Sequence, residues 1–100
     1  MNIKELIEKV EIETWKGVKV ILRKELSWFD YLEAQKIKDD DERGIFTISK
    51  LVESWEITND EGDPLPITEE SIRNLPTPIM LPIIEKVNEL VKEKYEKKKI

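Results

Sequence analysis

Residues 9–23 have the sequence KVEIETWKGVKVILR, which predicts a β-hairpin. Over residues 9–15 apolar side chains alternate with glutamates, and this period of two is typical of a strand with one buried face. Lys16 and Gly17 supply the turn, because glycine tolerates the positive φ that tight hairpin turns require. Alternation resumes over residues 18–23. An isolated hairpin is only marginally stable in water, so we expect helices to cover one of its faces.

Two helices are predicted directly after the hairpin. Ser27 is in position to cap the first helix, with Asp30 in the place of a capping-box acid, and the helix extends to about Lys38. A polar break follows over residues 39–43. From about Ile45, apolar residues recur at intervals of three and four, which predicts a second amphipathic helix. The apolar positions assigned to this second helix are Ile45, Ile48, Leu51, Val52 and Trp55.

The remaining sequence predicts a loop and two further helices. Residues 57–67 contain a glycine and two prolines, which favour a loop. Thr68 caps a short helix that ends at Leu75-Pro76, because the residue before a proline leaves the α region. The final helix runs to about Lys98, and Pro82 is compatible with it only in the first turn. The apolar face assigned to this helix contains Leu81, Ile84, Val87, Leu90, Val91 and Tyr95.

This order of elements predicts an α+β fold in which an N-terminal hairpin packs against about four helices, with mostly helical content. A length of 100 residues fits a single domain over residues 1–100. Residues 92–100 are rich in lysine, and we expect them to form a basic, frayed helix end.

The composition excludes several classes of function. The chain has no histidine and no cysteine, which removes the usual general base, the usual thiol nucleophile and the commonest transition-metal ligands. The net charge of −5 opposes general binding to nucleic acid, because attraction to phosphate needs a basic field. No stretch approaches the ~18 apolar residues of a membrane span. Residues 1–10 lack the apolar core of a signal peptide, so we expect a cytoplasmic protein.

We identify no candidate residue for catalysis, for cofactor binding or for metal binding. Placing Gly62 at the glycine position of a calcium loop puts Ile57 at the first ligand position, and placing Gly44 there puts Lys50 at the last one. The serines have no histidine to activate them, and the glycines lie too far apart to cradle a phosphate. We therefore expect a protein that is not an enzyme.

Contacts with other proteins offer the better hypothesis. Trp28 and Trp55 lie on apolar helical stripes, so we expect them to fill the core. Trp15 falls on the glutamate face of its strand and is a candidate contact residue. The hairpin edge is a second candidate surface. The final helix is a third, because an apolar stripe wider than the core needs would allow a homo-oligomer to form. The candidate protein-contact residues are Trp15, Val87, Val91 and Tyr95.

A family resemblance rests on the order of several segments. Residues 18–32 (VKVILRKELSWFDYL) contain a strand, an arginine-containing segment and a capped helix. Residues 51–58 (LVESWEIT) end in a tryptophan-bearing stretch, and residues 59–67 (NDEGDPLPI) follow as an Asp-Glu-Gly-x-Pro-Leu loop. Residues 68–76 (TEESIRNLP) and 83–92 (IIEKVNELVK) close the pattern. In this order the segments resemble the small tail assembly chaperones of siphovirus-type phages and prophages.

The resemblance implies an accessory protein of the host cytoplasm that binds the tape-measure protein, keeps it soluble and aids assembly of the tail tube. It implies no enzymatic activity, no cofactor and no place in the mature virion. The family has no catalytic motif, and Trp55 and Pro64-Leu65 match positions that look structural. Two alternatives remain open: a structural virion component, such as a tail-tube or head–tail connector subunit, and a small regulator that binds nucleic acid through its lysine tail.

Overall fold

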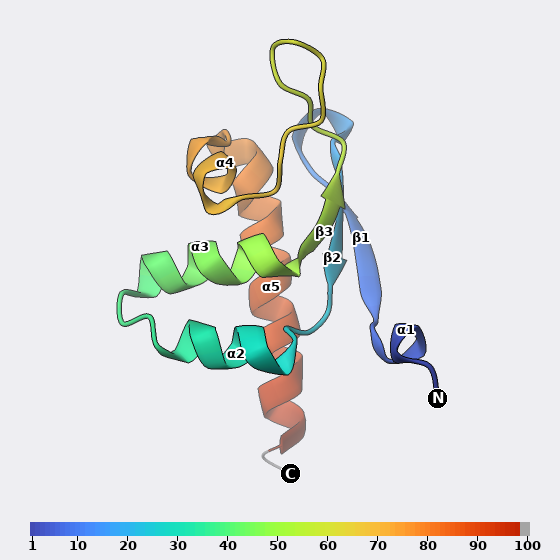
Figure 1. Cartoon of the computed structure of the whole chain (residues 1–100), viewed down its shortest axis with the longest axis vertical. Coiled ribbons are helices and arrows are strands. Elements are labelled where there is room, and N and C mark those ends of the chain that lie inside the picture. Colours follow the sequence, from blue (N-terminus) through green and yellow to red (C-terminus); the bar gives the residue numbers. More distant parts are fainter. Residues whose placement is uncertain (99–100) are drawn as a thin grey trace.

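The computed structural model describes the backbone of residues 1–98 and the side chains of residues 1–92. It has an α+β fold of mostly helical content, which confirms the predicted fold class (Figure 1). One three-stranded antiparallel sheet has the strand order β1-β2-β3. The elements are α1 (Ile3–Leu6), β1 (Lys9–Glu13), a 3₁₀ turn (Trp15–Gly17), β2 (Lys19–Arg23), α2 (Trp28–Gln35), α3 (Asp40–Leu51), β3 (Val52–Trp55), α4 (Glu69–Asn74) and α5 (Thr77–Lys98).

The predicted hairpin is confirmed as β1 and β2. The two strands pair antiparallel, with Val10 opposite Leu22, so the apolar side chains of both strands lie on one face of the sheet. Lys16 and Gly17 both have positive φ, at 58° and 76°, as the central residues of a type I′ turn do. β1 ends at Glu13, because the following residues form the 3₁₀ turn.

The third strand corrects the predicted second helix. The prediction that Val52 and Trp55 continue that helix is wrong, because α3 ends at Leu51 and the chain leaves it as β3. β3 pairs antiparallel with the second edge of β2, with Val52 opposite Leu22. Apolar residues at intervals of three and four describe only the local sequence. They carry no information about the edge of β2, which is distant in sequence and whose backbone groups need hydrogen-bond partners once they are buried.

The start of α3 also differs from the prediction. We predict a polar break over residues 39–43 and a helix from about Ile45, but α3 begins at Asp40. The side chain of Asp39 caps it by accepting a hydrogen bond from the Glu42 amide at 2.9 Å. The acidic side chains of the first turn lie beside the positive end of the helix dipole, so this polar stretch stabilises a helix.

Two helix caps confirm the sequence prediction. The hydroxyl of Ser27 accepts a hydrogen bond from the Asp30 amide at 3.1 Å and begins α2, which ends at Gln35 rather than near Lys38. The hydroxyl of Thr68 caps α4 in the same way, and α4 ends directly before the predicted stop at Leu75-Pro76.

The long helix α5 reaches Lys98 as predicted, but of the predicted apolar face only Val87 belongs to the buried core. Ile79, Ile83 and Val87 point into the core, whereas Leu81 and Ile84 of the predicted face are exposed. The apolar residues of α5 cover more than one face, so spacing alone does not identify the stripe that packs on the sheet. Pro82 lies inside the helix beyond its first turn, which corrects the predicted limit on its position. The helix therefore lacks the hydrogen bond that an amide at this position would donate.

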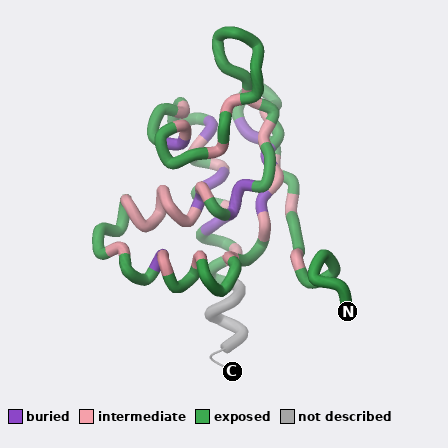
Figure 2. Tube along the Cα trace, viewed as in Figure 1, coloured by how far each residue is buried: buried purple, intermediate pink, exposed green. Residues whose placement is uncertain are grey.

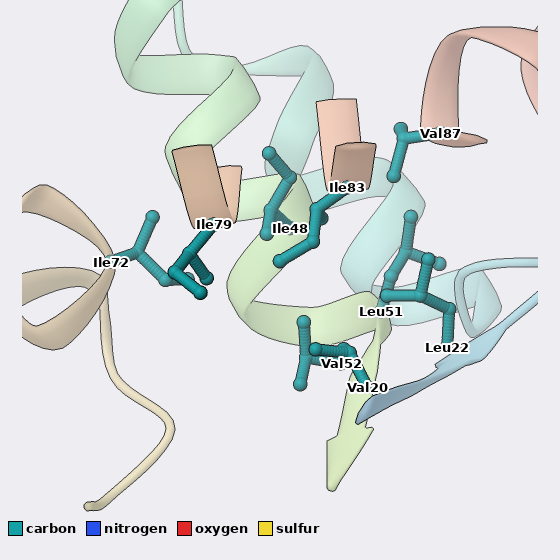
Figure 3. Close-up of a cluster of buried hydrophobic side chains, with 9 residues drawn as sticks. All are labelled: Val20, Leu22, Ile48, Leu51, Val52, Ile72, Ile79, Ile83 and Val87. Carbon is teal, nitrogen blue, oxygen red and sulfur yellow. The ribbon is translucent and has the colours of Figure 1, made fainter. Parts of the chain in front are cut away.

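The core lies between the sheet and helices α3, α4 and α5 (Figure 3). Buried residues form a band through the centre of the molecule, while the loop after β3, α1 and most of α2 are exposed (Figure 2). Trp55 packs against this core as expected, although from a strand, and its Nε1 donates a hydrogen bond to the Leu65 carbonyl at 2.8 Å. The buried cluster contains Val20, Leu22, Ile48, Leu51, Val52, Ile72, Ile79, Ile83 and Val87.

An ion-pair network joins all three strands on the opposite face of the sheet. The carboxylate of Glu53 lies 3.1 Å from Lys9 Nζ and 3.2 Å from Arg23 Nε. The hydrogen bond from Lys9 is the main reason why the pKa of Glu53 lies below its ordinary value of about 4.5. Ion pairs between charged side chains therefore join the strands on this face, and the other face of the sheet forms the core.

The network makes stability depend on pH in a defined direction. Because the pKa of Glu53 is lowered in the folded state, its stabilising effect is complete above about pH 4.5 and is lost as the pH falls through the folded-state pKa. Replacing Glu53→Gln should lower the melting temperature at neutral pH and have progressively less effect as the pH is lowered towards about 3. Calorimetry checks this against Glu56→Gln, an exposed control. An equal effect of Glu53→Gln at both ends of this range would contradict it.

Candidate protein-binding groove

Helix α2 exposes several large apolar side chains to solvent. Trp28 is 73% exposed and Phe29 is 67% exposed, and Tyr31 and Leu32 are also exposed. The prediction that Trp28 fills the core is therefore wrong. α2 packs against α3, and Ala34 is its only buried residue. Because only this small side chain is buried, the large side chains of α2 remain partly exposed and available to another molecule.

A groove of about 540 Å³ lies between α2, α3 and α5. Trp28 and Tyr31 form its wall on α2, with ring centroids 5.8 Å apart in a stacked arrangement. Leu90 and Val91 form the wall on α5. The full lining contains Lys24, Glu25, Leu26, Trp28, Tyr31, Ala34, Gln35, Thr47, Leu51, Val87, Leu90 and Val91.

A second recess adjoins this groove at Thr47 and Val87. It has a volume of about 440 Å³ and lies between α3 and α5. Ile84 adds a further exposed apolar side chain to its lining. Gly44 in α3 also lines it, and a Cβ atom placed there would meet nothing within 4 Å. We call the two adjoining recesses together the α5 groove.

The structure brings only some of the predicted contact residues together. Val91 is exposed on the wall of the α5 groove, and Val87 lies at its base but is only 8% exposed, because it belongs to the core. Trp15 is exposed at the hairpin turn, where Lys16 Nζ lies 4.3 Å from its ring centroid. In Figure 1 this turn lies at the opposite end of the molecule from α2. Tyr95 lies outside the described side chains.

Trp28 and Tyr31 are groove residues that we do not predict from the sequence. Their spacing does not reveal this, because the large apolar residues Trp28, Phe29, Tyr31 and Leu32 fall within one arc of about 160° around the helix, which is the pattern of a single buried face.

The hairpin edge is less suited to binding a partner. β1 is the edge strand, and its hydrogen bonds to β2 leave the backbone groups of Lys9, Glu11 and Glu13 directed away from the sheet. The side chains at these positions are charged, and charges on an edge strand oppose pairing with another strand. The candidate interface is therefore the α5 groove.

The described residues show no sign of a catalytic or metal centre at the groove. The described groups whose pKa shifts are Glu42, Glu53 and Arg73, and none of them lines the groove. The pKa of Glu42, which stands between the lining residues Asp41 and Arg43, is lowered chiefly by the hydrogen bond from Arg73. Among these residues, no three side chains of the kinds that bind metals gather at one place. None of the described helices combines the length and the apolar character needed to cross a membrane.

Comparison with known proteins found no matching family model, no matching curated protein and no matching solved structure. The functional interpretation therefore depends on the residues of the chain itself.

The exposure of Trp28 predicts a small effect on stability. Replacing Trp28→Ala should change the free energy of unfolding by less than about 1 kcal/mol, because the side chain leaves no cavity behind. Replacing the fully buried Ile83→Ala should cost about 2–5 kcal/mol. Urea unfolding followed by circular dichroism measures both values. A loss of about 3 kcal/mol or more for Trp28→Ala would place this residue in the core instead.

Proposed function

We propose that this chain is a non-enzymatic accessory factor that binds another protein through the α5 groove. The observation that carries the proposal is the open apolar groove beside the exposed side chains of Trp28 and Tyr31. Contiguous apolar surface of this kind is costly in water and marks interaction sites. Tryptophan and tyrosine supply much of the binding energy in protein interfaces, so these two residues are the expected anchors.

The shape of the groove suits an amphipathic helix. Such a helix places its apolar residues on one side at intervals of three, four and seven positions, and binds by laying this side into an apolar groove. The aromatic wall on α2 and the aliphatic wall of Leu90 and Val91 on α5 would enclose that side of the guest. Ile84 extends the contact along α5 for a guest of more than two turns.

The resemblance to tail assembly chaperones supplies the identity of the guest. We propose that the α5 groove binds helical segments of a phage tape-measure protein, keeps them soluble in the host cytoplasm and aids assembly of the tail tube. The net charge of −5 would help to keep such a complex soluble. In this role the chain makes no bond itself, needs no cofactor and leaves the particle before the virion matures.

Two exposed tryptophans at opposite ends of the molecule provide the test and its control. Trp28→Ala should weaken binding to the tape-measure protein at least about tenfold, because it removes an anchor worth more than about 1.4 kcal/mol. Trp15→Ala should leave binding unchanged, because Trp15 does not line the groove and the hairpin turn that carries it lies at the other end of the molecule from α2 (Figure 1). Co-purification of tagged chain and tape-measure protein, followed by titration, measures the dissociation constants.

Three results would contradict this function. Binding could be insensitive to Trp28→Ala, it could be lost equally in Trp15→Ala, or the chain could remain in purified phage particles. The last result would identify a structural virion component, because a chaperone is absent from the finished particle.

A further inference from the structure

The segment before β1, residues 1–7, holds apolar side chains that its own chain does not cover. We call residues 1–7 the α1 segment. Asn2 caps its helical turn by accepting a hydrogen bond from the Lys4 amide at 2.9 Å. Ile3 is 71% exposed and Leu6 is 63% exposed, so the turn displays both side chains to solvent. Displaying apolar side chains in this way is unfavourable in water unless another surface covers them.

The α1 segment and the α5 groove complement each other. Ile3 and Leu6 lie three residues apart in this helical turn, which is one of the intervals by which a helix presents apolar side chains to a groove. The α5 groove displays Trp28 and Val91 and has no guest among the described residues. One chain thus contains both a short apolar helical turn and an apolar groove that accepts such a turn.

The position of the α1 segment favours the groove of another copy. Glu8, which follows the segment, is fixed to β2: its carbonyl accepts a hydrogen bond from the Lys24 amide at 2.9 Å, and its carboxylate lies 3.7 Å from Lys24 Nζ. From this anchor the segment extends on the β1 side of the sheet, whereas α2 lies on the other side (Figure 1). The segment would have to turn back across the end of the sheet to reach its own groove.

We propose that the α1 segment of one copy docks in the α5 groove of a second copy, with Ile3 and Leu6 between Trp28 and Val91. The contact brings together the exposed apolar residues of both surfaces. Reciprocal exchange of the two segments would close a symmetric dimer. The proposal goes beyond the proposed function and does not depend on it, because it involves no other protein. It adds that a guest helix must displace the α1 segment from the groove.

Self-association of the purified full chain is the first test. Sedimentation velocity over a concentration series should show a reversible association, and Ile3→Ser with Leu6→Ser should raise its dissociation constant at least about tenfold. The matched control is Lys4→Ser with Glu5→Ser, which changes the other face of the same turn and should leave the association unchanged. All four side chains are exposed, so the variants keep the fold, which circular dichroism checks.

The absence of cysteine from the chain makes a cross-linking test unambiguous. A chain with Ile3→Cys and a differently tagged chain with Val91→Cys should form a disulfide between positions 3 and 91 when mixed and oxidised, identified by mass spectrometry of the linked peptides. A chain with Glu5→Cys in place of Ile3→Cys should react with the Val91→Cys chain at least about tenfold more slowly, because position 5 points away from the groove.

Several results would overturn the proposal. The wild-type chain could stay monomeric at all concentrations, or its association could be unaffected by Ile3→Ser with Leu6→Ser. Cross-linking to Val91→Cys could also proceed at equal rates from positions 3 and 5. A double variant with Ile3→Cys and Val91→Cys that closes an internal disulfide as a monomer would assign the segment to its own groove. Each measurement is made without a guest protein, so a negative result leaves the proposed function to its own test.

Discussion

Burial of the apolar face of β2 is the constraint on which the rest of the structure depends. Val20 and Leu22 are completely buried on this face, and Ile83 of α5 is equally buried in the same cluster. The opposite face carries the ion pairs of Glu53, so only one side of the sheet can form a core. With three short strands to cover, α3, α4 and α5 provide all the helical surface that this core requires.

The position of α2 follows from this constraint. Because the core is already covered, α2 contributes only Ala34 to the buried residues and lies against α3 with Trp28 directed outward. α5 extends past the sheet, so Val91 remains exposed opposite α2. The α5 groove is therefore a consequence of having more apolar helix than core, and its aromatic wall gives the chain a means of holding another helix.

The features that the sequence predicts correctly are local ones. The hairpin and its Lys16-Gly17 turn, the caps at Ser27 and Thr68, and the end of α4 depend on residues that are close in sequence. Contacts between distant segments explain the errors. β3 exists because β2 has a second edge, and both the buried face of α5 and the exposure of Trp28 depend on which helix covers the sheet. Val91 is predicted as a contact residue because the apolar stripe of the final helix is wide. The exposure of Trp28 and Tyr31 opposite it depends on contacts between distant segments and is therefore not predicted.

The solvent accessibility of Trp28 tests this account most directly. In a chain with Trp15→Phe and Trp55→Phe, Trp28 is the only tryptophan, and a chain that keeps only the partly buried Trp55 serves as the reference. Acrylamide quenching of fluorescence in dilute solution should be nearly as efficient for Trp28 in the folded chain as in urea, and much weaker for Trp55. If folding protects Trp28 as strongly as Trp55, the outward face of α2 and the groove beside it do not exist in solution.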